Sequence, residues 1–404
     1  MESRYLLWGL NMFFEYEMKE KTSLEDLIYL KDGYPFSNRE ELAVAVKHYS
    51  RREVLKRVAY LISENNLMFP YRDYSEEKLR STFTQLKHEK YDMSYEEWKC
   101  YKIPKIDHGF KGKQIIFNSK KSHYNKLSNF YMQGERLKTS YRGNISPLNY
   151  WEKLRKKECD GKHLTAVFMR PTFNRAELLR CFDMSIHIKS VTQFKPQVAK
   201  NIYDFFDAKN VLDFCSGWGD RLVGFLASNA ESYIGIDPNS NLHKPYKKIQ
   251  QLYAPNKKTT FICSPAEEVD YSDLKYDFVF TSPPYFDLEI YTQEETQSVR
   301  KFNKLDLWLE GFLFKSLSKV YEGLEEGGRI AVNICDFEGV EICTKIIQHM
   351  ESTGAVFEGI VGYGIQARSS VLHTDDLPLC EPIFIWSKGK APEPKWNQAN
   401  FFGV

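Results

Sequence analysis

The sequence predicts an α/β fold, in which a doubly wound and mostly parallel sheet follows a largely helical, basic N-terminal region. Two observations predict the sheet. From about residue 209 onward, short apolar and β-branched runs alternate with amphipathic segments of helical period. The runs are also continuously apolar, as in parallel strands that are covered on both faces. The length of 404 residues suggests that the sheet belongs to one of two domains.

Seven strand-like segments follow one another in this second half. We expect them at 210–215, 232–239, 259–265, 277–284, 328–336, 355–363 and 381–388. Helices are expected between most of them, the longest over 305–326, where Gly327 and Gly328 end it. Ligands of such sheets bind beyond the carboxyl ends of the strands, so functional residues are expected directly after each strand.

The first half reads differently. Residues 38–64 and 75–99 have the apolar spacing of helices. Residues 102–157 hold fourteen Lys or Arg against three Asp or Glu, with interleaved aromatic residues, although the whole chain carries only +2. This segregated charge predicts a surface for a nucleic-acid backbone, with Lys120 and Lys121 as candidate phosphate contacts. The alternative is a solvated basic face with core aromatics.

We therefore expect a recognition region over 1–190, the sheet domain over 191–390 and a tail over 391–404. No run approaches 18 apolar residues, so no membrane span is expected. The N-terminus has neither a basic leader nor a small-residue cleavage site, so no signal peptide is predicted. The eight cysteines are scattered without a CxxC pair, which predicts free thiols in a reducing, cytoplasmic compartment and no metal site.

The first motif is VLDFCSGWGDRL, residues 211–222. Gly217 and Gly219 allow a sharp turn and a close approach of a ligand to the backbone. The helix that follows begins with unpaired N–H groups. Asp213 at the strand end is a candidate anionic partner of a ligand, and Cys215 lies in the turn. The alternative is an ordinary tight turn whose aspartate is satisfied within the protein.

The next two strand ends complete a candidate cofactor pocket. Asp237 in YIGIDPN is placed to accept both hydroxyls of a ribose, and Pro238 follows it. Pro265 and Ala266 in SPAEE offer an apolar shelf for an adenine ring. GWGDRL does not fit GxGxxG, which disfavours a dinucleotide.

The fourth strand ends in DFVFTSPPYFDLEIY, residues 277–291. Its Ser-Pro-Pro-Tyr stops the strand, because neither proline has an N–H to donate to a ladder. The alternative is a surface turn with a packed tyrosine. Asp287, Glu289 and Tyr291 either line a substrate pocket or form a solvated loop face. The polar segment 291–304 is predicted to be a mobile loop over the site.

Taken in order, these motifs resemble the Rossmann-like S-adenosyl-L-methionine (SAM)-dependent methyltransferases. SPPY is similar to the [DNS]PPY signature of the DNA amino-methyltransferases, which modify adenine N6 or cytosine N4. CSGWGDRLVG and TSPPYFDLE resemble a group of phage- and virus-encoded DNA methylases of that class. The similarity covers about 190–390, roughly half the chain. It implies SAM as cofactor without a metal, and duplex DNA as partner with the target base flipped out. Lys195 in FKPQVAKNIYDFF then contacts the methionine end of SAM.

The resemblance also implies roles for the motif SPPY. An exocyclic amino group is a poor nucleophile because its lone pair is delocalised into the ring. Ser282 Oγ and the Pro283 carbonyl would accept its two hydrogens, with Pro284 adding stiffness. Tyr285 would stack on the base, and Phe286 continues the motif. A serine at this place leans toward cytosine N4.

Other functions stay open at this point. The same chemistry could act on RNA, or the chain could be a catalytically silent nucleic-acid-binding subunit. A protein glutamine methyltransferase usually has Asn in place of Ser282. A cytosine C5 enzyme is disfavoured because it needs a cysteine after a proline, and the chain has no Pro-Cys pair. The sequence does not define the oligomeric state.

Overall fold

A computed structural model describes residues 23–365 and 377–396, except 91–92, 101, 104–105, 108, 119–121, 170, 293 and 338. The predictions for the N-terminus, for Lys120 and Lys121, and for the tail beyond residue 396 lie outside the described residues. The chain divides into two compact units, one of Met1–Arg72 with Leu137–Ser190 and the other of Asp73–Arg136 with Val191–Val404. The expected border near 190 is thus one of three, and Asp73–Arg136 belongs with the sheet.

The first unit is mostly helical, around a core of its own. The predicted helix over 38–64 is two helices, because Tyr49 is extended and Ser50 begins a capping box with Glu53. β1 and β2 form an antiparallel hairpin. The elements of this unit are α1 Leu24–Leu27, β1 Tyr29–Lys31, β2 Tyr34–Phe36, α2 Arg39–His48, α3 Arg51–Glu64, β5 Ser140–Tyr141, α6 Pro147–Arg155, η2 Thr165–Met169 and α7 Arg175–Met184.

The second unit contains the sheet and the helices that cover it, with short 3-10 or π segments labelled η. Its elements are α4 Glu76–His88, β3 Met93–Ser94, β4 Ile116–Phe117, η1 Ser122–Asn125, α5 Lys126–Arg136, α8 Pro196–Phe205, β6 Asn210–Asp213, α9 Asp220–Ala227, β7 Ser232–Ile236, η3 Ser240–Leu242, α10 His243–Tyr253, β8 Lys258–Ile262, η4 Ala266–Glu268, β9 Phe278–Thr281, η5 Phe286–Leu288, β10 Glu289–Ile290, α11 Ser298–Lys301, α12 Leu305–Trp308, η6 Leu309–Phe314, α13 Lys315–Gly323, β11 Arg329–Asn333, α14 Ile342–Ser352, β12 Val356–Gly364 and β13 Cys380–Ser387.

The sheet has the strand order β3-β4-β12-β13-β11-β9-β6-β7-β8. All seven predicted strands are present, which confirms the α/β fold. β8, β7, β6, β9 and β11 are parallel, and β13 runs antiparallel to both of its neighbours. Nine strands rather than seven make up the sheet, because β4 covers the free edge of β12 and β3 pairs with β4. β3 lies within 75–99, so the helix expected there ends at His88.

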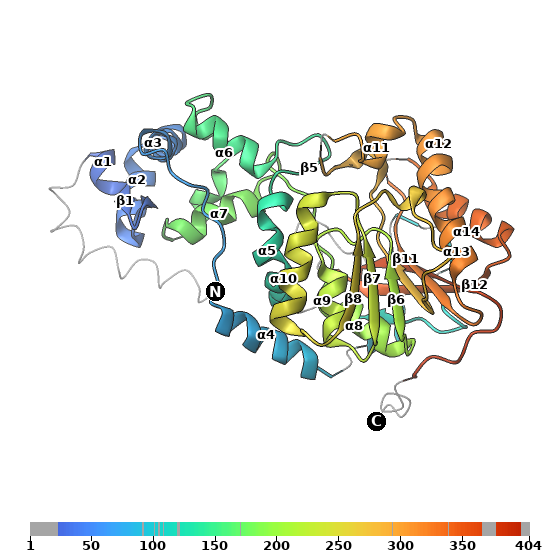
Figure 1. Ribbon diagram of the computed structural model, residues 1–404. Helices are drawn as coiled ribbons and strands as arrows, with labels where there is room; N and C mark the ends of the chain where they lie inside the picture. The colour runs from blue at the N-terminus through green and yellow to red at the C-terminus, as the bar shows by residue number, and fades with distance from the viewer. Residues whose placement is uncertain are drawn as a thin grey trace. The chain divides into compact units, whose positions relative to one another are not determined.

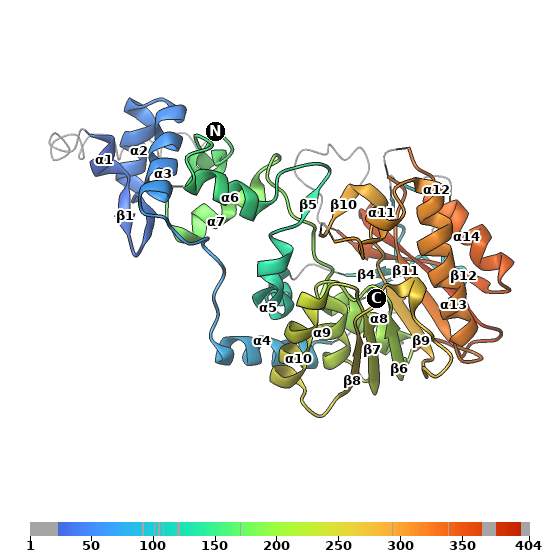
Figure 2. The ribbon, with the colours of Figure 1, turned by 45° about the horizontal axis from the view of Figure 1, so that its top comes forward.

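Helices cover the two faces of the sheet, with α8, α9 and α10 on one side and α13 and α14 on the other (Figures 1 and 2). α8 and α9 pack closely at Gly224, where a Cβ would lie 2.6 Å from the Cβ of Ala199. The strand order reverses between β6 and β9. At such a switch point the loops after the two strands diverge and leave a crevice at the carboxyl edge.

The long helix expected over 305–326 is irregular in its middle. The predicted helix over 305–326 is formed by α12, η6 and α13, and its middle turn is a π-helix. Gly311 in that turn faces the Phe302 ring, and a Cβ there would lie 2.4 Å from it.

All eight cysteines lie among the described residues and are unbridged, as predicted. Within the described ranges, no helix has the length and apolar character needed to cross a membrane.

Candidate active site

The turn after β6 is fixed by its two glycines. Gly217 and Gly219 have φ of +53° and +73°, a region that glycine enters without the penalty of a Cβ. Gly217 N donates to Asp237 Oδ2 at 2.9 Å, and its carbonyl accepts from the Tyr246 hydroxyl at 2.5 Å. Gly219 is the N-cap of α9. The turn is therefore held by the next strand end and by α10.

Asp213 is saturated by hydrogen bonds inside the protein. Its Oδ2 accepts from Arg221 Nε and the Tyr233 hydroxyl, both at 2.8 Å. Its Oδ1 accepts from Arg221 Nη2 at 3.2 Å, Thr281 Oγ1 at 3.1 Å and Cys215 N at 3.3 Å. The carboxylate is fully buried. This differs from the expected anionic partner of a ligand: Asp213 holds the turn through Arg221, and Cys215 is bonded into the same cluster.

Asp237 has a different environment. Its Oδ2 accepts from Gly217 N and its Oδ1 from Asn239 N, each at 2.9 Å. Asp237 as a whole is only half-buried. Burial raises the pKa of Asp237 to about 6, against the effect of the Asn239 and Gly217 N–H groups. A carboxylate oxygen has two lone pairs, so each oxygen keeps one for a further donor. This arrangement suits a pair of neighbouring hydroxyls.

The apolar shelf lies after the adjacent strand β8. Pro265 is half-buried and is the N-cap of η4, and Ala266 is buried. The Ala266 carbonyl accepts from the Tyr271 hydroxyl at 2.9 Å, which fixes this turn. Cys263 Sγ lies 3.7 Å from the Pro238 carbonyl, which links the ends of β7 and β8.

Lys195 is the N-cap of α8 and is half-buried. Burial lowers the pKa of Lys195, and the negative charge of Asp220 at the start of α9 opposes this. Asp220 accepts hydrogen bonds from Ser128 Oγ and from Gln193 Nε2, the latter at 3.1 Å. Burial raises the pKa of Asp220 to about 7. A cation and an acid thus lie near the Gly217–Gly219 turn, at the starts of two packed helices.

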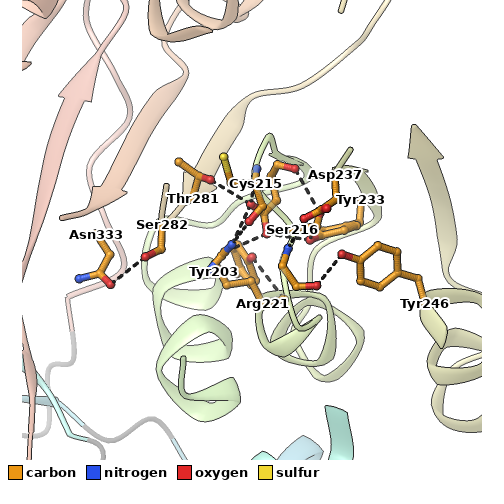
Figure 3. Close-up of polar contacts among 12 residues, drawn as sticks. Tyr203, Cys215, Ser216, Arg221, Tyr233, Asp237, Tyr246, Thr281, Ser282 and Asn333 are labelled. Carbon is orange, nitrogen blue, oxygen red and sulfur yellow. Dashed lines mark hydrogen bonds and ion pairs between the residues drawn. The ribbon is translucent and has the colours of Figure 1, made fainter. Parts of the chain in front are cut away.

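The motif SPPY follows β9, on the other side of the switch point. Ser282 Oγ donates to Asn333 Oδ1 of β11 at 3.3 Å (Figure 3). Among the described residues, none donates a hydrogen bond to the Pro283 carbonyl. Phe286 has φ of +46°, which is strained for a residue with a large side chain. The strand therefore ends in a stiff, partly strained turn with a free acceptor.

Tyr285 is held at several atoms. Its hydroxyl lies 3.6 Å from Cys335 Sγ, and its ring contacts Phe337 edge-on with centroids 5.9 Å apart. Its N–H donates to Glu289 Oε2 at 3.3 Å. Burial raises the pKa of the Tyr285 phenol, so it stays neutral near pH 7. Pro284, between the acceptor and the ring, is half-buried.

Glu289 is buried, so of the two expectations for this residue the solvated loop face is wrong. Of Asp287, Glu289 and Tyr291, only Asp287 is exposed. Glu289 Oε2 also accepts from the Tyr291 hydroxyl at 3.0 Å, and burial raises the pKa of Glu289 to about 7. The Tyr291 ring lies 5.5 Å from the Trp218 ring of the glycine turn. Glu289 and Tyr291 therefore connect the two motifs.

The segment after Tyr291 is anchored, whereas we predicted a mobile loop over 291–304. Gln297 is buried, donates to the Glu289 carbonyl at 3.1 Å and accepts from Thr292 N at 2.8 Å. Ser298 Oγ accepts from Trp308 Nε1 at 2.9 Å. Polar composition was misleading here because these polar groups bond within the protein. Gln293 lies outside the described residues.

The basic stretch 102–157 is split between the two units at residue 136. Several of its aromatic side chains are core residues rather than stacking platforms, as the alternative reading expected: Phe110, Phe117, Tyr124, Tyr150 and Trp151. Lys111 pairs with Glu358 at 3.4 Å and Glu393 at 2.9 Å. Lys153 and Lys156 of the α6 region are exposed and have no ion-pair partner among the described residues.

Sequence reasoning missed three polar residues of this site, Arg221, Tyr233 and Asn333. Each lies in an otherwise apolar strand or helix and is buried, at 5%, 1% and 3% exposure. A polar residue inside an apolar run must find a partner there, which is the signal that could have identified them. No group of three or more His, Cys, Asp or Glu side chains within the described ranges is arranged to hold a metal.

Neither a protein-family model nor a curated protein matches this chain. Solved structures of methyltransferases are similar to about half of it. Precorrin-6y C5,15-methyltransferase from Geobacter metallireducens is 15% identical over 47% of this chain and 86% of its own, with a TM-score of 0.31. TrmN from Thermus thermophilus is 14% identical over 48% of each chain, with a TM-score of 0.34. An rRNA methylase from Streptococcus thermophilus is 13% identical over 49% of this chain and 99% of its own, with a TM-score of 0.31. Likenesses of this degree concern the fold alone, and the chemistry has to be argued from the site.

Proposed function

We propose that this chain transfers a methyl group from SAM to an exocyclic amino group of a base in DNA, adenine N6 or cytosine N4. The observation that supports this most is the pairing of two loops at the switch point of one sheet. The turn after β6 offers a glycine loop, and Asp237 at the end of the adjacent β7 offers a half-buried carboxylate with spare lone pairs. The turn after β9, across the switch point, offers two oxygen acceptors beside an aromatic ring.

The residues at the strand ends fit SAM. Asp237 keeps one lone pair on each oxygen for the two ribose hydroxyls. The half-buried Pro265 offers an apolar ring for the adenine to lie against, next to the buried Ala266. Lys195 offers a cation to the methionine carboxylate, and Asp220 offers an acid near it. Bound SAM supplies a methyl group on a positively charged sulfur, and its transfer to nitrogen leaves a neutral thioether and one proton to be removed.

The chain's own part is to make the amino nitrogen a better nucleophile. Ser282 Oγ and the Pro283 carbonyl accept no hydrogen bond from any described residue, so both can accept from the two amino hydrogens. Fixed acceptors draw these hydrogens out of the ring plane and need no reorganisation during the reaction. Tyr285 provides a ring for stacking, worth roughly 1–3 kcal/mol per base.

Glu289 is the candidate acceptor of the released proton. A group whose pKa lies near the working pH is the most effective proton acceptor, and burial raises the pKa of Glu289 to about 7. Its Oε2 accepts from Tyr285 N and Tyr291, while its Oε1 has no partner among the described residues. Glu289 accepts a hydrogen bond from Tyr285 N, at the end of the Ser282–Tyr285 turn. A proton released at that turn could therefore reach Glu289 directly or through a water.

The proposed function is tested with labelled SAM and three acceptors: duplex DNA, RNA and protein. Wild type is expected to bind SAM in calorimetry and to label DNA. Tyr285→Ala should bind SAM equally well but transfer no label, whereas Tyr285→Phe, which keeps the ring, should retain most turnover. Labelled RNA or protein without labelled DNA would contradict the proposed substrate. Absence of SAM binding by wild type would contradict the proposed chemistry as a whole.

A further inference from the structure

At the place proposed for Ser282, a serine hydroxyl can either donate a hydrogen bond to the substrate or accept one from it. It has one hydrogen to donate and two lone pairs to accept with. An aspartate or asparagine at the same place always presents an acceptor oxygen. A serine presents only acceptors to the substrate when its hydrogen is engaged elsewhere. The partner of that hydrogen therefore decides whether Ser282 can accept from an amino group.

The structure gives that hydrogen one partner, Asn333 Oδ1, at 3.3 Å from Ser282 Oγ. Asn333 is 3% exposed and lies at the end of β11, beside β9 and β13. No described residue donates to Ser282 Oγ, so both of its lone pairs stay available. Ser282 would lose this acceptor for its hydrogen if the Asn333 amide turned over and donated to Ser282 instead.

The surroundings of Asn333 allow one orientation. Its Nδ2 donates to the Pro382 carbonyl at 3.0 Å, and a carbonyl can only accept. A turned amide would bring its oxygen against the Pro382 carbonyl and leave its buried N–H without that acceptor, which is costly. Oδ1 must therefore face Ser282.

We propose that Asn333 is a positioning residue that takes the Ser282 hydrogen and thereby makes Ser282 Oγ an obligate acceptor for the amino group of the substrate. This inference rests on the proposed function of the Ser282 turn. β13 contributes to the site through it, because Pro382 fixes Asn333 from the strand on the far side of β11. Asn333 acts only through Ser282 and does not touch the substrate.

A double-mutant cycle on methyl transfer tests this role. Ser282→Ala should lower kcat by about 10²-fold, as expected for the loss of one fixed group in the transition state. Asn333→Ala should lower kcat by roughly tenfold, with KM for DNA and the affinity for SAM unchanged, since one neutral hydrogen bond is lost. The double variant should be no slower than Ser282→Ala, because without the hydroxyl Asn333 has nothing to orient. Effects that multiply in the double variant would overturn the proposal.

Two further variants separate this role from a general effect on the fold. Asn333→Val suits a strand and cannot accept a hydrogen bond, so it should reproduce the kcat loss if Asn333→Ala is unstable. Glu381→Gln leaves the Pro382 carbonyl in place and should cost less than Asn333→Ala. An active Asn333→Val with wild-type kcat would overturn the positioning role while leaving the proposed function intact. A wild type that methylates no substrate would instead overturn the proposed function, and the inference with it.

Discussion

Asp213 and Asp237 end neighbouring strands of one sheet, yet their surroundings differ in the number of partners. Asp213 receives five hydrogen bonds, two of them from Arg221, and is fully buried. Asp237 receives two, both from backbone N–H groups, and is half-buried. A saturated buried carboxylate contributes to the fold, whereas a carboxylate with free lone pairs can contribute to binding.

The pH dependence of SAM binding should report on Asp237. Hydroxyl donors need the ionised carboxylate, and burial raises the pKa of Asp237 to about 6. Affinity should therefore be constant above pH 7 and fall as pH drops through 6, by about tenfold at pH 5. Calorimetry between pH 5 and 8 measures this. Asp237→Asn should bind weakly at all pH values and lose this part of the dependence; the same pH profile in the variant would exclude Asp237 from the ribose role.

Removal of the Asp213 charge should affect stability more than binding geometry. Asp213→Asn leaves the Arg221 guanidinium buried without its counter-charge, which costs roughly 3–5 kcal/mol. The free energy of unfolding in urea measures the loss. Asp237→Asn is the matched control, and its loss should be much smaller because no ion pair is broken. Equal stability of Asp213→Asn and wild type would contradict a structural role for Asp213.

Among the elements, those with a strong local signal were predictable and those defined by a partner were not. Each of the seven expected strands is present because continuous apolar, β-branched runs can only be buried between two helical layers. β3 and β4 have two residues each, too short for any period, and exist because β12 offers a free edge. The anchoring of Gln297 likewise depends on the distant Glu289 carbonyl and leaves no trace in local composition.

Replacing two helix glycines with alanine should change the free energy of unfolding in opposite directions. A Cβ on Gly224 of α9 would lie 2.6 Å from Ala199 Cβ and 2.8 Å from the Pro196 carbonyl of α8. Gly224→Ala should therefore destabilise the protein by about 1–3 kcal/mol and weaken SAM binding, since α8 and α9 carry Lys195 and the glycine turn. A Cβ on Gly134 of α5 meets no atom within 4 Å, so Gly134→Ala should stabilise by roughly 0.5–1 kcal/mol. Urea unfolding of both variants checks the signs, and a stabilised Gly224→Ala would contradict the close packing of α8 on α9.

At the scale of the whole molecule, sheet topology brings together motifs that lie far apart in the sequence. The turns after β6 and β9 are about 60 residues apart but flank the switch point, which is why strand order explains the site better than sequence distance. The motifs and the strand ends were predictable from local residues. The side-chain bonding of Asp213 and Ser282 was not, because Arg221, Tyr233, Thr281 and Asn333 come from other strands and from a helix.

The proposed DNA contact predicts a salt dependence. Lys153 and Lys156 remain as exposed candidates in the basic stretch. Each phosphate contact adds about −0.9 to the slope of log K against log salt, so replacing both with Ala should make the slope shallower by about one to two units. Sequence preference should not change, because phosphate contacts position without specifying. Lys247 and Lys248, an exposed pair on α10, are the matched control; equal slopes for both double variants would exclude the α6 lysines as phosphate contacts.

The chemical identity of the methylated nucleoside is the sharpest test of the proposed methyl transfer to an amino group. DNA incubated with the protein and SAM is digested to nucleosides and analysed by mass spectrometry, beside DNA treated with Tyr285→Ala. Two acceptors and a stacking ring beside Ser282 predict N6-methyladenine or N4-methylcytosine in the wild-type sample and neither in the variant. Methyl groups found only on cytosine C5, or no methylated nucleoside at all, would contradict the account.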